Sequence, residues 1–317
     1  MTRVAAIDCG TNSIRLLVAD VINTPAGFTL VDVHREMRVV RLGEGVDQTG
    51  VLQTGAIDRT WAALSDYTAI LRASGATSVR MAATSATRDA SNRNDFVEMV
   101  RRTLGQDPEV ITGNEEAELS FRGAIGGVAA SGGPYMVVDI GGGSTEMVIG
   151  TTNNVQVALA GSASVNIGCV RLTERLLHSD PPTEAEIDQA RQLVTHVLSE
   201  GLDSLPVASI KTLVAVAGTA TTVAAAALHL PTYDPAKIHL QRISATQVSE
   251  VATLMLGATT AHRAALGYMH PGRVDVIGGG SLILDTLVQL VQDRVHLDQI
   301  TVSEHDILDG LALSLGQ

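Results

Sequence analysis

The sequence predicts an α/β protein made of two related domains, each with a mixed sheet, and two observations lead to this prediction. In the first 130 residues, short apolar runs and stretches of helical spacing alternate in the order βββαβαβα. After a Ser-Gly-Gly-Pro segment at 131–134, the three-strand pattern begins again around a similar turn. Because 317 residues can bury more than one core, we expect one domain at 1–122, joined by a C-terminal helix at about 304–317, and another at 123–303.

The elements of the first domain follow from apolar spacing and from turn and cap residues. Apolar residues three and four positions apart predict a helix at 54–74, with Trp61 in the core. The other expected elements are strands at 3–8, 14–22, 28–40, 79–83 and 109–112 and helices at 92–104 and from 113 to about 130.

The second domain repeats the three strands and adds more helix than the first. The segment 231–243 is predicted to be a loop, and Gly278-Gly279-Gly280 lies between apolar segments of helical character, which favours close helix packing over a third phosphate turn. The other expected elements are a third strand around 155–160, helices near 168–178, 183–202, 245–256 and 262–268, strands at 212–217 and near 298–302, a helix after Gly218-Thr219, and a terminal helix.

The turn Asp139-Ile140-Gly141-Gly142-Gly143-Ser144-Thr145-Glu146 joins two apolar runs and predicts strand, tight turn, strand. Consecutive glycines leave the backbone open to a ligand, and their N–H groups can converge on a phosphate. Asp139 and Glu146 are hard oxygen ligands that suit Mg²⁺. Taken alone, the motif is more often a Gly-rich hairpin with solvated carboxylates.

A second copy of this turn near the N-terminus changes which of these two interpretations, phosphate turn or plain hairpin, is favoured. Shifting the sequence by 131 residues places Asp8 on Asp139, Gly10 on Gly141, Ser13 on Ser144 and Arg15 on Glu146, with apolar strands on either side. Two phosphate-type turns facing each other would form a cleft, so the repeat favours phosphate chemistry.

Charged residues near these turns are further candidates. Arg15 follows the first turn directly, and Arg88 follows the strand at 79–83, at the strand end where α/β sheets bind ligands. Glu115, Glu116 and Glu118 begin a helix, where the macrodipole favours carboxylates without any function; the functional alternative is a general base for an attacking water. Gly218-Thr219 is a weaker phosphate signal, equally consistent with a plain helix start.

Composition excludes several classes of function. A net charge of −12 and 3% aromatic residues argue against a nucleic-acid binder and against a membrane-surface protein. The two cysteines, Cys9 and Cys169, are too few and too far apart for a disulfide framework or a zinc site. The N-terminus lacks a signal-peptide core, and the mostly apolar stretch 212–230 contains Gly218 and His229, so we expect a cytoplasmic protein.

Three motifs together resemble the exopolyphosphatase/guanosine pentaphosphate phosphohydrolase (Ppx/GppA) family. They are the turn from Asp8 to Arg15, the helix start Gly113-Asn114-Glu115-Glu116-Ala117, and the turn from Asp139 to Glu146. The resemblance covers essentially the whole chain. It implies two ribonuclease-H-like domains of the actin-like, sugar-kinase and heat-shock ATPase superfamily flanking a cleft, and hydrolysis of terminal phosphate from polyphosphate or pppGpp.

The resemblance also implies roles for single residues. Glu116 matches the catalytic Glu, and Asp139 and Glu146, with Asp8, match carboxylates associated with Mg²⁺ or Mn²⁺. The positions that match phosphate contacts are Asn12, Ser13, Arg15, Arg88, Gly141, Gly142, Gly143, Ser144, Thr145 and Arg273. A homodimer is expected from the family alone.

The C-terminal segment departs from the family pattern. Leu308-Asp309-Gly310 stands where the family usually carries Arg-Glu-Gly, which puts a cleft-edge contact there in doubt. The chain also resembles the short form of the family, without the C-terminal helical domain, and we expect a preference for shorter polyphosphate chains.

The leading hypothesis is a metal-dependent exopolyphosphatase in which Glu116 activates the water, and the runner-up is a pppGpp 5′-phosphohydrolase. An ATP-dependent sugar-type kinase would need an adenine pocket, for which only Gly218-Thr219 is a signal. A non-catalytic actin-like polyphosphate- or nucleotide-binding regulator would be expected to lack Glu116 or the metal carboxylates, which are all present.

Overall fold

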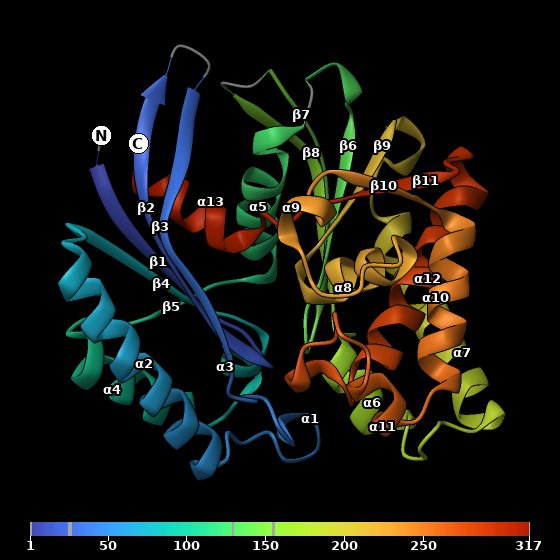
Figure 1. Ribbon diagram of the computed structural model, residues 1–317, viewed down its shortest axis with the longest axis horizontal. Coiled ribbons are helices and arrows are strands. Elements are labelled where there is room, and N and C mark those ends of the chain that lie inside the picture. Colours follow the sequence, from blue (N-terminus) through green and yellow to red (C-terminus); the bar gives the residue numbers. More distant parts are fainter. Residues whose placement is uncertain (1, 25–26, 129, 154–155, 317) are drawn as a thin grey trace. The chain divides into compact units, whose positions relative to one another are not determined.

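The computed structural model describes residues 2–24, 27–128, 130–153 and 156–316 and contains two mixed sheets (Figure 1). By their contacts the residues form two compact units. Unit 1 is built from residues up to Gly126 and from Asp306 onward, and unit 2 from residues between Gly127 and His305. Within the described residues, no helix combines the length and the apolar character needed to span a membrane.

The sheet of unit 1 has the strand order β3-β2-β1-β4-β5. The first three strands are antiparallel, and β4 and β5 then add in parallel. The strands are β1 (Thr2–Cys9), β2 (Ser13–Thr24), β3 (Gly27–Val39), β4 (Ser78–Ala83) and β5 (Glu109–Val110). The helices of this unit are α1 (Val46–Thr49), α2 (Thr54–Ser74), α3 (Ser85–Asp89), α4 (Arg93–Leu104), α5 (Gly113–Ala124) and α13 (Ile307–Ser314).

Strand β1 is apolar from Val4 to Ile7, where both of its faces are covered. Ala5 and Ile7 pack into one core with residues of α2 and α4, whereas Val4 and Ala6 pack into another with residues of α5 and α13. Successive side chains of a strand point to opposite faces, so Asp8 lies on the same face as Val4 and Ala6. This alternation directs Asp8 toward the α5/α13 side of the sheet.

Unit 2 repeats this sheet and extends it. Its strand order, β10-β11-β9-β6-β7-β8, contains the same sequence of strand directions as unit 1, with β10 added as an antiparallel edge strand. The strands are β6 (Tyr135–Ile140), β7 (Thr145–Thr152), β8 (Val157–Val165), β9 (Thr212–Val216), β10 (Gln241–Ser244) and β11 (Gln299–Val302). The helices are α6 (Cys169–Leu176), α7 (Glu184–Asp203), α8 (Ala217–Ala227), α9 (Pro235–Ile238), α10 (Ala245–Gly257), α11 (Thr260–Ala264) and α12 (Ile277–Val295). The predicted α/β class with two related mixed sheets is confirmed.

The repeat extends to irregular features of the backbone. The pairing of β2 with β3 shifts register between Val18 and Ala19, and the pairing of β7 with β8 shifts between Ile149 and Gly150, at the same 131-residue offset as the turn motifs. A β-bulge of this kind bends a strand and increases its twist. The two sheets therefore share a deformation as well as a strand order.

The three consecutive glycines of α12 pack against neighbouring helices, as the sequence predicts. A Cβ on Gly279 would lie 2.7 Å from Thr173 Oγ1 of α6, and one on Gly280 would lie 2.5 Å from Thr219 Oγ1 of α8. These distances are shorter than side-chain contacts allow, so glycine is what permits α12 to approach α6 and α8.

The prediction that Trp61 belongs to the core is wrong, because 53% of its surface is exposed. The buried face of α2 includes Thr60, Leu64 and Tyr67. Trp61 follows Thr60 and is rotated by about 100° around the helix from it. Its side chain therefore lies beyond the edge of the buried face and is exposed to solvent.

Three predicted boundaries and one predicted loop also change. The strand expected at 109–112 contains only Glu109–Val110, since Thr112 already caps α5, and α5 ends at Ala124 before two glycines rather than continuing to 130. The expected loop at 231–243 contains α9 and part of β10, which pairs with the distant β11. Of the third strand expected around 155–160, residue 155 lies outside the described residues and β8 continues to Val165.

A close helix contact in unit 1 yields a stability prediction. A Cβ on Gly310 of α13 would lie 2.0 Å from the backbone oxygen of Leu119 on α5, so Gly310→Ala should lower the free energy of unfolding by about 1–3 kcal/mol. Gly55 of α2 offers a matched control, because its Cβ would meet only Arg59 Nη1 at 3.7 Å. Gly55→Ala should be neutral or stabilising by up to about 1 kcal/mol. Urea denaturation of both variants checks this, and equal effects would contradict the packing argument.

Candidate active site

In unit 1, Glu116 is held at the start of α5 by Arg88. Thr112 caps this helix by accepting a hydrogen bond from the Glu115 amide, and Glu116 follows in the first turn with only 8% of its surface exposed. Arg88 Nη1 donates to Glu116 Oε2 at 2.8 Å and to the backbone oxygen of Ile111 at 3.0 Å. The structure thus brings together two predicted site residues from α3 and α5, and the guanidinium fixes the orientation of a nearly buried carboxylate.

Arg15 lies between two buried carboxylates of the same unit. It is the register partner of Asp8 across β1 and β2, and it donates from Nη2 at 2.7 Å and from Nε at 3.0 Å to Asp8 Oδ2. Its Nη1 donates to Asp306, the N-cap residue of α13. Arg15 is therefore oriented by both of its neighbours.

The two carboxylates beside Arg15 differ electrostatically. Burial raises the pKa of Asp8 above its ordinary value in spite of Arg15, and Oδ1 of Asp8 is buried without a hydrogen-bond partner among the described residues. Burial would also raise the pKa of Asp306, but Arg15, the Leu308 amide and Arg35 hold it below its ordinary value. Asp8 is thus the group of this pair that retains an unsatisfied oxygen.

The two predicted phosphate turns have the same backbone construction. Gly10 N donates to Ser13 O, and Gly141 N donates to Ser144 O, both at 3.0 Å. In unit 1 the carbonyl of Asn12 accepts from the amides of Val40 and Arg41, and in unit 2 the carbonyl of Gly142 accepts from those of Val170 and Arg171. In both units, backbone amides of the segment after the third strand donate to carbonyl oxygens of the turn and so hold the turn in place.

This anchoring leaves amide groups of the second turn available. Among the residues that the structure describes, the amides of Gly142 and Gly143 donate to no backbone or side-chain oxygen, and the Ser144 hydroxyl has no hydrogen-bond partner. Thr145 differs, because its hydroxyl is fully buried and donates to the Ile167 oxygen at 2.6 Å. Successive unused N–H groups are the donors with which backbone turns bind anions.

Gly168 sets how closely α6 approaches this turn. A Cβ on Gly168 would lie 2.5 Å from the carbonyl carbon and oxygen of Gly142. The glycine thus allows the start of α6 to sit on the turn, where the Cys169 amide also donates to Gly141 O. The sequence analysis did not single out Gly168.

Asp139 and Glu146 lie side by side on one face of the unit 2 sheet. They are register partners across β6 and β7, which places their Cβ atoms roughly 5 Å apart. Both are buried, with 6% and 1% of their surfaces exposed, and Ser164 of β8 donates to Glu146 Oε1 at 2.8 Å. The offset that puts Arg15 on Glu146 thus gives unit 1 an Asp–Arg pair and unit 2 a pair of carboxylates.

Arg273 is the last residue of η4 (Pro271–Arg273) and lies against the start of α8. A Cβ on Gly218 would lie 2.5 Å from three atoms of the Arg273 side chain, and Arg273 Nη1 donates to Thr222 Oγ1 at 3.3 Å. Gly218 therefore makes room for a guanidinium at this helix N-terminus.

The carboxylates suit a divalent cation that substrate helps to hold. No group of three or more His, Cys, Asp or Glu side chains within the described ranges could hold a metal ion by itself. Mg²⁺, however, is usually bound by one or two carboxylates, water and substrate phosphates. The carboxylate pair Asp139/Glu146, and the unsatisfied Oδ1 of Asp8 in unit 1, are donors of that kind.

The contacts of the C-terminal segment Leu308-Asp309-Gly310 were not predicted from the sequence. Leu308 is buried in the core beneath α13, and Asp309 accepts from Arg35 Nη2 at 2.6 Å and from the Asp306 amide at 3.1 Å. The departure from the family motif thus supports packing and the capping of α13. The signal was present, because two acidic residues three positions apart before an apolar run resemble a capping box.

Neither cysteine is a reactive thiol. Cys9 and Cys169 are both buried, and burial raises the pKa of Cys9 strongly and that of Cys169 to about 11. Both thiols are protonated near neutral pH, so Cys9 acts as a small apolar side chain beneath the first turn.

Comparison with known proteins places this arrangement among phosphatases. A chain of Mycobacterium tuberculosis called exopolyphosphatase 2 is 53% identical over 320 residues, which covers 99% of each chain. A guanosine-5′-triphosphate,3′-diphosphate pyrophosphatase of Vibrio atlanticus is 34% identical over 200 residues, 63% of this chain and 38% of its own.

A solved structure agrees with the fold over its whole length. The crystal structure of an exopolyphosphatase-like protein, 39% identical, superposes with a TM-score of 0.93 and covers 99% of this chain and 97% of its own. The model of the Ppx/GppA phosphatase family matches residues 21–315. The chain therefore belongs to the Ppx/GppA phosphatase family.

Proposed function

We propose that this member of the family is an exopolyphosphatase, which hydrolyses the terminal phosphate of inorganic polyphosphate. The observation that carries the proposal is the nearly buried Glu116 held by Arg88 at the start of α5, in a chain 53% identical to a protein named exopolyphosphatase 2. Hydrolysis of a phosphoanhydride requires an oriented water, donors for the phosphoryl oxygens and compensation of their charge.

Unit 1 supplies the base and two guanidinium groups. Glu116 accepts the proton of the attacking water, and its position is defined by the Arg88 contact and by the rigid first turn of α5. Arg15, held by Asp8 and Asp306, and Arg88 compensate negative charge on the phosphoryl oxygens. The turn with Asn12 and Ser13 contributes backbone and side-chain contacts to phosphate.

Unit 2 supplies anion donors and metal ligands. The amides of Gly142 and Gly143, the hydroxyl of Ser144 and the backbone of Thr145 bind phosphate oxygens, Gly141 leaves room for the phosphate beside the turn, and Arg273 adds a guanidinium. Asp139 and Glu146 are the proposed ligands of Mg²⁺ or Mn²⁺ in this unit, and Asp8 is a proposed ligand in unit 1. Such an ion, when bound, neutralises phosphate charge and polarises the phosphoryl oxygen.

A second candidate is hydrolysis of the 5′-terminal phosphate of pppGpp. Relatives of this chain carry the name guanosine-5′-triphosphate,3′-diphosphate pyrophosphatase, and they are less identical to it than exopolyphosphatase 2.

We also propose that the protein is cytoplasmic and forms a homodimer. Sedimentation at micromolar concentration measures the oligomeric state.

Replacing the proposed base gives the first test of the mechanism. Glu116→Gln keeps the size of the side chain but removes the proton acceptor, so kcat should fall by about 10²- to 10⁴-fold. Phosphate release from polyphosphate with Mg²⁺ measures this. Glu115→Gln is the matched control, because Glu115 is exposed and, among the described residues, pairs only with Arg80 and the helix cap. A folded Glu116→Gln variant with full activity would remove the assignment.

Replacing a metal ligand should change the metal requirement. In Glu146→Gln the Mg²⁺ concentration for half-maximal phosphate release should rise at least about tenfold, since one anionic donor is lost. A chelator should abolish activity in the parent protein, and either Mg²⁺ or Mn²⁺ should restore it. Asp285→Asn is the control, because Asp285 is also a buried carboxylate of unit 2 but pairs with Arg191 and Ser249. An equal rise in both variants would point to a general loss of stability.

Parallel assays separate the two substrates. Initial rates with short polyphosphate, long polyphosphate and pppGpp should rank short polyphosphate first, if the proposed chain-length preference holds. A higher kcat/KM for pppGpp would establish the second candidate, and strongest activity on very long polymers would refute the chain-length preference. Binding of polyphosphate without phosphate release would support a regulator.

A further inference from the structure

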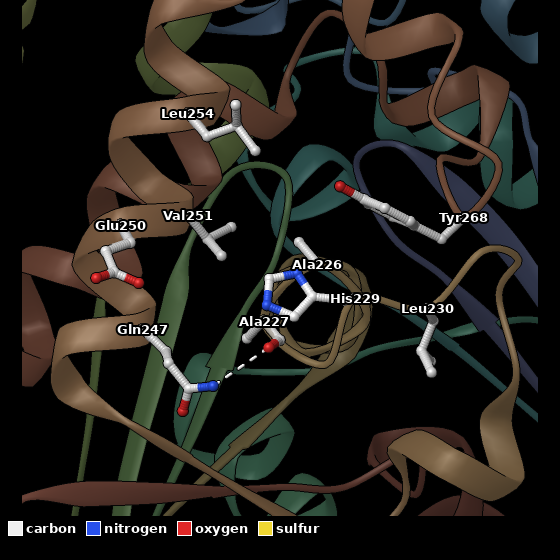
Figure 2. A pocket seen from close by; sticks show the side chains of 9 residues that line it. All are labelled: Ala226, Ala227, His229, Leu230, Gln247, Glu250, Val251, Leu254 and Tyr268. Atoms are coloured by element: carbon white, nitrogen blue, oxygen red, sulfur yellow. Dashed lines mark hydrogen bonds between the residues drawn. The ribbon is translucent and has the colours of Figure 1, made fainter.

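Unit 2 contains a cavity that none of the proposed catalytic residues lines. It has a volume of about 390 Å³ and lies between the C-terminal end of α8, one face of α10 and the segment after α11 (Figure 2). The lining residues are Ala226, Ala227, His229, Leu230, Gln247, Glu250, Val251, Leu254 and Tyr268. This volume is within the range of pockets that bind small molecules.

The floor and one wall of the cavity are apolar. Ala226 and Ala227 of α8 face Val251 and Leu254 of α10, and Leu254 keeps 53% of its surface exposed. The ring of Tyr268 forms the opposite wall, with 9% of its surface exposed and its hydroxyl directed toward α10 (Figure 2). An alkyl or aryl group could therefore bury its surface against three elements.

Among the described lining residues, Glu250 is the one acidic side chain at the cavity, and the other polar side chains that line it are His229, Gln247 and Tyr268. Glu250 is exposed and forms no ion pair or hydrogen bond with another described residue, and none of the nine lining side chains is Lys or Arg. Gln247 is already engaged, since its Nε2 donates to Ala227 O and its Oε1 accepts from the Ser244 amide. The C-terminal end of α8 adds the negative pole of a helix macrodipole.

We propose that this cavity binds a small organic cation, an ammonium group attached to an apolar body. The ammonium group pairs with Glu250 near the end of α8, and the apolar body packs on Ala226, Val251 and Leu254 beside the Tyr268 ring. Phosphorylated and carboxylate compounds are disfavoured by the same charges. The site thus selects a ligand of opposite charge to the polyphosphate substrate, and it does not depend on the proposed function.

Three probes of equal length and different charge test the proposal on the full-length protein. Isothermal titration with hexylammonium, hexanol and hexanoate at pH 8, which limits the positive charge on histidine side chains, compares their affinities. Hexylammonium should bind about tenfold more tightly than hexanoate, with hexanol between them, because the probes share six carbons and carry a positive, neutral or negative head group. Hexanoate binding as tightly as hexylammonium, or no binding of any probe, would overturn the proposal.

Variants at exposed positions locate the binding. Glu250→Gln should weaken hexylammonium about three- to fivefold and leave hexanol unchanged, whereas Glu184→Gln on α7, outside the cavity, should change neither. Leu254→Ser should weaken hexylammonium and hexanol alike, since both alkyl chains lose the same contact. Equal effects of Glu250→Gln and Glu184→Gln, or no effect of Leu254→Ser, would place the binding elsewhere and refute the assignment.

Discussion

Both sheets depend on a central strand that is covered on its two faces. In unit 1, alternate residues of β1 pack toward α2 and α4 and toward α5 and α13, and β6 occupies the same place in unit 2. A strand buried in this way must be apolar along its length, so a carboxylate at its end is conspicuous and costly unless it is compensated. Asp8 and Asp139 are those carboxylates, and the turns that follow them are anchored through their carbonyls.

The two copies of this arrangement have diverged at one position that decides their chemistry. Opposite Asp8 stands Arg15, which pairs with Asp8 and Asp306, whereas opposite Asp139 stands Glu146. One unit therefore presents a compensated, oriented cation, and the other presents two adjacent carboxylates. A shared backbone with opposite charges at equivalent positions thus supplies the positive group and the adjacent carboxylates on which the proposed phosphate chemistry rests.

Glycine controls the helix contacts around these turns. Gly168 lets α6 sit on the second turn, Gly218 makes room for Arg273, and Gly280 lets α12 approach α8. Helix α8 consequently has two different surroundings: a guanidinium at its first turn, and at its last turn a cavity with a carboxylate and no Lys or Arg among its described lining residues. The helix macrodipole favours an anion at the N-terminal end and a cation at the C-terminal end. It therefore explains neither the guanidinium of Arg273 at the first end nor the carboxylate of Glu250 at the second. Tertiary packing, rather than the helix itself, places Arg273.

The sequence by itself determined the order of strands and helices along most of the chain, the repeated turn and the helix start that carries Glu116, because these depend on local periodicity, glycines and caps. It also predicted that the glycines of α12 serve packing. Tertiary structure decided the contacts between residues that are far apart in the sequence. Trp61 is exposed rather than in the core, β10 forms by pairing with β11, and Arg15 pairs with Asp306, 291 positions away. Such contacts leave no mark in a local pattern, since the energy that favours them comes from burial and charge across the fold.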